Sequence, residues 1–413
     1  MGFNVLDTLS KLAVESGFAG FFAAGGWQNL VMIVVACVLL YLGIVKGFEP
    51  LLLIGIAFGC LLANVSYFPG LSAELNATNA LYHPELWSEF LDHNSEFYHS
   101  YGHILSNAGL LDIFYIGVKA GLYPSLIFMG VGAMTDFGPL IADPKSLLLG
   151  AAAQLGVFVA FFGAICLGFT GPQAASIGII GGADGPMAIY TTMKLAPHLL
   201  PQISVAAYSY MALMPLIQPP IMKMLTNSDE RKIMMKQPRY VSRLEKIAFP
   251  IVIGVIVNIF LPPVAPLITM LMLGNLLREC LVVTKLAETA SNTLLNIVTM
   301  VLTVAIGSTM AAGTFLTYKT VLIIFLGLVA FAFGTASGVV CAKIMCKLSH
   351  GKINPLIGSA GIASVPIAAR VSHLVGQRES RSVFLLMHAM GPNLAGVFGT
   401  AISGGIMLAL LGG

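Results

Sequence analysis

Charge is scarce in this sequence. Only 9% of its 413 residues are charged and 57% are hydrophobic, whereas a soluble globular domain carries roughly 25% charged residues. So little charge excludes a water-soluble globular protein and makes lipid the expected solvent for much of the chain. The basic residues form no extended stripe and the net charge is only +3, so we expect no nucleic-acid partner.

Cysteine is also scarce, and the N-terminal segment does not have the pattern expected of a secretory signal peptide. No two of the six cysteines have the CxxC spacing, and all lie in or beside apolar tracts. We therefore interpret them as reduced packing residues and expect neither disulfides nor an Fe–S cluster. Asp7 and Glu15 interrupt the N-terminal segment, and no basic stretch precedes an apolar run there. Residues 1–25 instead have the pattern of an amphipathic helix lying in the membrane interface.

Apolar tracts dominate what is present. A spanning helix needs about 20 apolar residues, so the tracts predict an all-α, polytopic membrane helix bundle of roughly ten spans. The 44 glycines fit close helix packing in lipid. We expect a first membrane hairpin at 26–65, a first membrane repeat at 109–225 and a second at 247–413.

Two polar segments separate these parts. Residues 66–108 are acidic and contain no Lys or Arg, which favours the outer side of the membrane, whereas residues 226–246 are strongly basic and are predicted to be cytoplasmic. Within the acidic segment, His99 and His103 could share a helix face near Glu96 and bind a metal. We prefer a solvated amphipathic hairpin.

Two segments of similar pattern form an internal repeat. Residues 177–190 and 355–369 are each apolar, then Gly-rich, then broken by Pro, then apolar again, and each precedes a tract with Met and Pro. Such paired interruptions indicate a transporter-like binding site. The backbone groups freed at a break must be buried in protein or line a wet cavity, where carbonyls coordinate cations and half-helix N-termini hold anions. The pattern predicts two broken helices, near 181–186 and 354–366, in an inverted-repeat, elevator-like architecture. Tight loops between short helices are the alternative.

Polar residues at these breaks are the candidate cation ligands. Asp184 lies inside the first break, where an unpaired carboxylate costs several kcal/mol. Asn354 opens the second break, and Asn393 lies in the tract that follows it. One carboxylate, two amides and backbone carbonyls would suit Na⁺, by analogy with other oxygen-preferring cations. Helix-to-helix hydrogen bonding is the alternative for the two asparagines.

Three further polar residues have open roles. Tyr210 could donate a proton or could be a packing residue. Arg370 ends the second broken segment and could grip a carboxylate with its guanidinium fork, or snorkel to the interface. Asp136 is a second acidic candidate, for which an interfacial cap is the alternative.

Five motifs carry a resemblance to a known family. The segments 181–186, 207–213, 215–222, 354–361 and 388–393 resemble the β subunit of oxaloacetate decarboxylase and its relatives in methylmalonyl-CoA and glutaconyl-CoA decarboxylases. The likeness runs from about residue 27 to the C-terminus and is weakest at 66–108. It implies a bacterial inner-membrane subunit of a decarboxylase sodium pump. Such a subunit decarboxylates carboxybiotin, consumes a proton and exports Na⁺, and no cofactor is attached to it covalently.

The resemblance also implies partners and roles. The partners are a biotinylated α subunit with the carboxyltransferase and biotin carrier, a small γ subunit and further copies of the β subunit. Carried over by position, the catalytic residues are Asp184, Tyr210 and Arg370; the carboxybiotin-binding residues are Arg370, Asn354, Gly358 and Ser364; and the Na⁺ ligands are Asp184, Asn354 and Asn393. The family has a functional Ser nine residues after the Asn, where this chain has Ala363 followed by Ser364.

Other functions would produce part of this pattern. A secondary Na⁺-coupled carboxylate transporter would show the same breaks and polar residues, but would move its substrate without chemistry. An intramembrane aspartyl protease would use Asp136 and Asp184, although such enzymes carry Gly-x-Gly-Asp rather than the Gly-Ala-Asp-Gly found here. The identity of the acid or acyl-CoA stays open, because biotin carries no record of its carboxyl donor.

Overall fold

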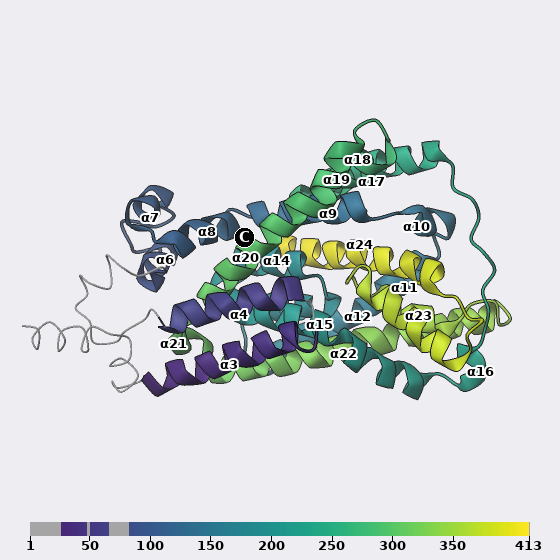
Figure 1. Cartoon of the computed structure of the whole chain (residues 1–413), viewed down its shortest axis with the longest axis horizontal. Coiled ribbons are helices and arrows are strands. Elements are labelled where there is room, and N and C mark those ends of the chain that lie inside the picture. The colour runs from purple at the N-terminus through teal and green to yellow at the C-terminus, as the bar shows by residue number, and fades with distance from the viewer. Residues whose placement is uncertain (1–25, 48–49, 66–81, 413) are drawn as a thin grey trace, which may run out of the picture. The chain divides into compact units, whose positions relative to one another are not determined.

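The computed structural model describes residues 26–47, 50–65 and 82–412, and every regular element in these ranges is a helix (Figure 1). The expected interfacial helix at 1–25 and residues 66–81 of the acidic segment lie outside the described residues. An all-helical chain follows from its solvent, since lipid offers no partner for backbone N–H and C=O groups and a helix satisfies them internally. The predicted all-α class is confirmed.

Within the described chain, six helical segments are long and apolar enough to cross a membrane. They are Gly26–Ile44, Ser146–Cys166, Pro197–Leu225, Thr284–Ser308, Tyr318–Leu348 and Leu386–Leu411. The bent pair α8 (Leu110–Lys119) and α9 (Leu122–Met134) makes seven if it is one span. The prediction of roughly ten treated each apolar tract as a span, but the tract 174–191 is divided between short helices that stop at a break.

The chain divides into two compact units. The first comprises the described residues up to Leu122 together with Val298–Thr320. In it, α3 (Gly26–Ile44) packs on α4 (Pro50–Val65), and two glycines of α4 let its backbone approach the end of α20 (Leu295–Ser308). A Cβ at Gly59 would lie only 2.3 Å from the carbonyl oxygen of Val304, so the helices meet at a distance that no other residue permits.

The described part of the acidic segment, residues 82–108, belongs to the first unit and packs around the buried carboxylate of Asp112. It contains α6 (Pro84–Leu91) and α7 (Tyr101–Asn107). The Asp112 carboxylate lies 2.6 Å from Nδ1 of His83 and accepts hydrogen bonds from Trp87 Nε1 at 2.7 Å and Gly109 N at 2.9 Å. His103 lies 3.4 Å from Glu89. Nowhere in the described chain do three or more His, Cys, Asp or Glu residues gather as a metal site would require.

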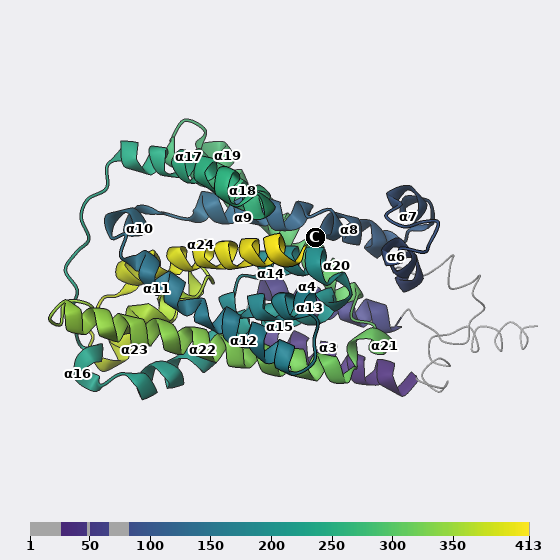
Figure 2. The same ribbon diagram turned by 180° about the vertical axis from the view of Figure 1, so that it is seen from behind.

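The second unit contains both broken segments, and the two have the same order of elements. The first runs through α11 (Ser146–Ala153), α12 (Leu155–Cys166), α13 (Gly171–Gly178), η1 (Ile179–Gly182), α14 (Gly185–Leu195) and α15 (Leu200–Leu225). The second runs through α22 (Tyr318–Leu348), η5 (Pro355–Gly361), α23 (Ile367–Glu379) and α24 (Leu386–Leu411). Each has a long helical stretch, a short helical segment, a break, a second short helix and a long helix. Figure 2 shows α24 running beside α11.

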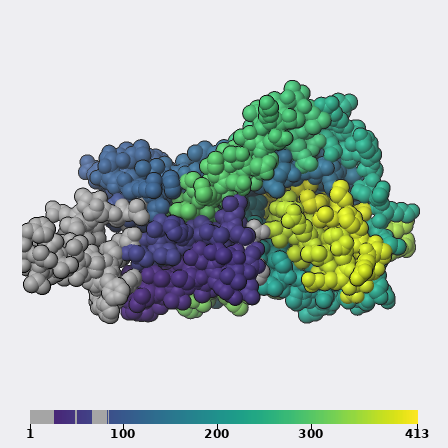
Figure 3. Space-filling model, viewed as in Figure 1, coloured from purple at the N-terminus to yellow at the C-terminus, as the bar shows by residue number. Residues whose placement is uncertain are grey.

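A second group of helices in this unit joins the two segments. After the basic segment, α17 (Arg243–Phe260) and α18 (Ala265–Glu279) form an antiparallel pair, followed by α19 (Thr284–Glu288) and η4 (Thr289–Leu294). Gly274 of α18 meets the carbonyl oxygen of Met129 in α9, 1.9 Å from where a Cβ would be. The space-filling view shows the α9–α10 stretch between α17–α19 and the C-terminal helices (Figure 3); α10 is Gly138–Ala142.

Candidate functional site

The two breaks meet in the second unit. The backbone N–H of Ala363, just after η5, donates a hydrogen bond of 2.9 Å to the carbonyl of Gly182 at the end of η1. The residues around this contact are almost wholly buried. An N–H group freed by one break is thus hydrogen-bonded to a carbonyl freed by the other. Such pairing is needed inside a membrane, because lipid offers backbone groups no partner.

Asp184 lies at the first break, at the start of α14. The chain reverses at Ala183, which has the left-handed φ of 53°, and Asp184 then caps the helix by accepting a hydrogen bond of 3.0 Å from Met187 N. The residue is 6% exposed. Its carboxylate has no cationic side chain within ion-pair distance among the described residues. The capping hydrogen bond and the dipole of α14 stabilise the carboxylate in this position.

Tyr208 packs directly against this turn, a contact that the sequence analysis missed. A Cβ at Gly185 would lie 2.3 Å from the Tyr208 ring, so the glycine is what lets the ring approach. The Tyr208 hydroxyl is buried without a hydrogen-bond partner in the described chain. A glycine directly after Asp184 was the only signal in the sequence that a bulky side chain approaches there.

Tyr210 faces elsewhere. Its hydroxyl donates to the carbonyl of Ile324 in α22, and its ring packs on Gly327 of the same helix. Residues two apart on a helix point about 200° apart. Since Tyr208 packs against the turn at Gly185, Tyr210 points to the other side of α15, toward α22, where Gly327 also meets Ile180 of η1.

Helix α24 contacts both breaks through one face. Asn393 donates hydrogen bonds to the carbonyls of Ala360 at 3.1 Å and Ile362 at 2.6 Å, while its Oδ1 is buried without a partner among the described residues. Thr400, two turns later, lies 2.6 Å from where a Cβ of Gly182 would be. The Asn393 amide thus closes the second break and leaves one oxygen free for a cation.

Asn354 is engaged differently from Asn393. It caps η5 by accepting a hydrogen bond of 3.0 Å from Leu356 N. Its Nδ2 donates to the carbonyls of Arg231 at 3.0 Å and Ile233 at 2.9 Å. The asparagine therefore ties the second broken segment to the basic segment, and no contact joins it to Asp184.

Gly358 and Ser364 both sit in tight packing. A Cβ at Gly358 would lie 2.1 Å from the carbonyl oxygen of Gly338 in α22. The Ser364 hydroxyl is buried 3.1 Å from Sδ of Met214 in α15. Ser364 adjoins Ala363, whose N–H bonds to the first break, so its hydroxyl lies on the α15 side of the junction.

Arg370 is exposed on α23, and its guanidinium has no hydrogen bond or ion pair within the described residues. The end of α23 is held by another arginine: Arg231 Nε lies 2.6 Å from Glu379 Oε1. This hydrogen bond from Arg231 lowers the pKa of Glu379 below its ordinary value. Arg370 thus has no ionic partner in the described part of the chain, while the end of its helix, α23, is held by the Arg231–Glu379 pair.

Asp136 has an ionic partner. Lys246 Nζ lies 2.8 Å from its Oδ1, which also accepts a hydrogen bond from Gly138 N. Burial raises the pKa of Asp136, but the hydrogen bonds from Lys246 and Gly138 outweigh it and hold the pKa below its ordinary value. This is the contact set of a paired cap at the end of α9, and no contact joins Asp136 to Asp184 as a protease dyad would need.

Together, the structure gathers Asp184, Asn393 and Ser364 at the junction of the breaks and adds Tyr208. It places Asn354 and Tyr210 in other contacts, and Arg370 on the exposed face of α23. A carboxylate, a free amide oxygen and backbone carbonyls are hard oxygen donors of the kind that alkali and alkaline-earth cations take. The junction is therefore a candidate cation site.

Comparisons with known proteins agree with this chemistry. The family model for the Na⁺-transporting oxaloacetate decarboxylase beta subunit matches residues 28–411. The methylmalonyl-CoA decarboxylase subunit beta of Propionigenium modestum is 56% identical over 409 residues, covering 99% of this chain and all of the relative. The glutaconyl-CoA decarboxylase subunit beta of Acidaminococcus fermentans is 54% identical, covering 98% of both chains. The oxaloacetate decarboxylase beta chain of Klebsiella pneumoniae is 50% identical, covering 93% of this chain and 95% of its own.

These matches cover nearly the whole chain, so they confirm the predicted family and a decarboxylase subunit rather than a secondary transporter or a protease. They also confirm the predicted multi-span membrane location, and the word subunit implies further chains in the complex. The chain belongs to the family of β subunits of the Na⁺-transporting decarboxylases.

Proposed function

We propose that this β subunit decarboxylates carboxybiotin and couples that reaction to Na⁺ export at the junction of its two breaks. The carboxybiotin is delivered by a biotinylated α subunit that carries the carboxyltransferase and the biotin carrier. A small γ subunit links the parts, and the β subunit forms a homo-oligomer. The observation that carries the proposal is the juxtaposition of two oxygen donors: the buried Asp184 carboxylate, which has no cationic side chain near it among the described residues, and the Asn393 Oδ1 at the second break, which no described residue contacts.

The reaction needs a proton and releases a neutral gas. When the ureido nitrogen of carboxybiotin takes up a proton, the bond to the carboxyl carbon breaks and CO₂ leaves. Moving one charge across a membrane costs about 2.3 kcal/mol per 100 mV. The decarboxylation can drive Na⁺ export if proton uptake and Na⁺ release alternate at the same carboxylate, which is the role proposed for Asp184.

The ligand roles follow the contacts. Asp184 and Asn393 are the proposed Na⁺ ligands, while Asn354 holds η5 in place as a positioning residue for that site. Arg370 offers a free guanidinium to the carboxylate of carboxybiotin, which reaches the chain from another subunit. Ser364 and Gly358 shape the second break, with Ser364 in place of the serine that the family carries one position earlier. Tyr208 joins Tyr210 as a candidate proton donor.

The matching element order of the two segments supports an inverted repeat that moves as one elevator body. Each segment contributes a pair of half-spanning helices around a break, and counting such pairs as spans brings the total toward the roughly ten expected from the apolar tracts. The α17–α18 pair is the proposed scaffold against which this body slides.

The decisive experiment is Asp184→Asn in the complete reconstituted complex. We expect Na⁺ uptake into vesicles and Na⁺-dependent CO₂ release from free carboxybiotin both to be abolished, while the chain still assembles with its partners. Asp143→Asn is the matched control, because Asp143 is an exposed loop carboxylate. Uptake at the wild-type rate in the Asp184 variant would remove this residue from the mechanism. Carboxylate uptake without CO₂ release would instead indicate a transporter.

A further inference from the structure

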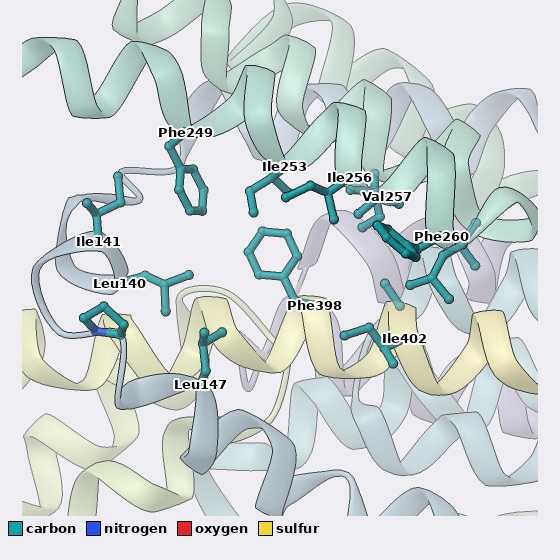
Figure 4. Close-up of a pocket in the computed structure, with 15 residues that line it drawn as sticks. Leu140, Ile141, Leu147, Phe249, Ile253, Ile256, Val257, Phe260, Phe398 and Ile402 are labelled. Carbon is teal, nitrogen blue, oxygen red and sulfur yellow. The ribbon is translucent and has the colours of Figure 1, made fainter.

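A cavity of about 410 Å³ lies between α17 and α24, which is the size range of small-molecule sites. Figure 4 shows Phe249 and Ile253 of α17 facing Phe398 and Ile402 of α24 across it. Leu140 closes one end (Figure 4). Every side chain that lines it is apolar.

The cavity lies on the opposite side of α24 from the candidate ion site. Successive residues of a helix are 100° apart, so Phe398 and Ile402 each point about 160–200° from Thr400. Thr400 contacts Gly182 at the first break. The cavity is thus separate from the junction of the breaks, with the thickness of one helix between them.

The chemistry of the walls restricts the occupant. Water in a cavity needs 2–4 polar partners, and this wall offers hydrocarbon. A biotin ureido ring would lose its hydrogen bonds at a cost of several kcal/mol. Because α24 is a candidate membrane span, the hydrocarbon available at this depth is the acyl chain of a lipid.

One end of the cavity reaches a polar layer. There Arg239 donates a hydrogen bond of 3.1 Å to the carbonyl of Ile141, and Lys246 pairs with Asp136. A second cavity of about 670 Å³ borders the same α10 turn, and its walls include Asp136, Arg239 and Lys246. The apolar cavity suits the acyl chain of a phospholipid, and the charged cavity beside it suits the headgroup.

We propose that one acyl chain of a membrane phospholipid occupies the apolar cavity, with its headgroup at the charged one. The basic residues there are already paired with carboxylates, Arg239 with Glu245 and Lys246 with Asp136. The site therefore selects for the chain rather than for an anionic headgroup. The lipid lies between the proposed scaffold helix α17 and the back of α24, but its binding does not depend on the proposed Na⁺ chemistry.

The test is photo-crosslinking of the complex in vesicles of phosphatidylcholine that carries a diazirine on one acyl chain. We expect the label to concentrate in peptides 249–257 and 398–402. Val257→Phe fills the cavity and should lower this labelling about tenfold. Val255→Phe is the matched control, because Val255 lies on the same helix, is 56% exposed and does not line the cavity.

Two results would overturn the proposal. One is equal labelling of the wild type and Val257→Phe, with both folded as judged by thermal unfolding. The other is even labelling along the exposed face of α17 without concentration at the cavity. Ile402→Phe fills the same space from the opposite wall and must reproduce the loss, so a folding defect in one variant cannot decide the outcome.

Discussion

Single hydroxyl groups distinguish the two tyrosines of α15. The Tyr210 hydroxyl is hydrogen-bonded to Ile324, so Tyr210→Phe should cost about 1 kcal/mol of stability. The Tyr208 hydroxyl is buried and has no hydrogen-bond partner among the residues that the structure describes, so Tyr208→Phe should be neutral or stabilising. If Tyr208 delivers the proton, its variant should nevertheless show the larger fall in CO₂ release.

Thermal unfolding and turnover across pH, measured on both variants, separate these roles. Full turnover in Tyr208→Phe at every pH would leave its ring as packing for Gly185. A turnover defect in Tyr210→Phe without loss of stability would return the donor role to Tyr210.

The guanidinium of Arg370 has a proposed role in binding the carboxylate of carboxybiotin. A lysine keeps the charge but lacks the planar fork that matches a carboxylate. We expect Arg370→Lys to weaken the apparent affinity for carboxybiotin about 30-fold at saturating Na⁺, the effect of losing about 2 kcal/mol of charge-assisted contact. Arg378→Lys, an exposed arginine on the same helix, is the control. Equal affinities in the two variants would make Arg370 an interfacial anchor.

At the scale of elements, the second broken segment depends on a glycine contact. Gly358 meets Gly338 of α22 so closely that a Cβ would lie 2.1 Å from a backbone oxygen. Backbone cannot yield as a side chain can, so Gly358→Ala should cost about 1–3 kcal/mol and displace η5 from α22. Gly102→Ala is the control, because nothing lies within 4 Å of a Cβ there. A Gly358 variant that unfolds at the wild-type temperature would show that η5 shifts without cost.

The ion pair between Arg231 of the basic segment and Glu379 of α23 should make the stability of the protein depend on pH. The Arg231 hydrogen bond lowers the pKa of Glu379 below its ordinary 4.5. A carboxylate whose pKa is lower in the folded state stabilises the fold fully at pH values above its unfolded-state pKa. That stability is lost as the pH falls through the folded-state pKa. The unfolding temperatures of wild type and Glu379→Gln should therefore differ most at neutral pH and converge in acid. A difference that is constant with pH would exclude this ion pair as its source.

Na⁺ binding should raise the thermal stability of the complex. A ligand that binds only the folded chain stabilises it by about 2.7 kcal/mol at 100 times its Kd. Na⁺ should therefore raise the unfolding temperature of the complex above its value in K⁺ at equal ionic strength. Asp184→Asn should remove this difference, while the Asp143→Asn control keeps it. An identical shift in the Asp184 variant would place the Na⁺ site elsewhere in the complex.

The class of the molecule and the positions of its breaks follow from local features of the sequence. Scarce charge and long apolar tracts require a helical membrane protein, because lipid satisfies no backbone groups. Clustered Gly and Pro around Asp184 and after Asn354 marked the interruptions, since Pro removes a backbone donor and Gly weakens the helix. These signals are local, and the family motifs coincide with them.

The partners of each polar side chain depend instead on how the helices pack in three dimensions. The first half of α15 is buried on nearly every side, so it has no polar face from which to tell whether Tyr208 or Tyr210 points at the break. The Asn354 amide donates to Arg231 of the basic segment, and the cavity behind Phe398 is formed by helices distant in sequence, so neither feature leaves a local pattern in the sequence. The spacing of apolar residues along a helix shows which of its faces is buried, provided that the opposite face is polar. When every face is buried, the rotation of the helix and its partners are set by packing across the whole unit.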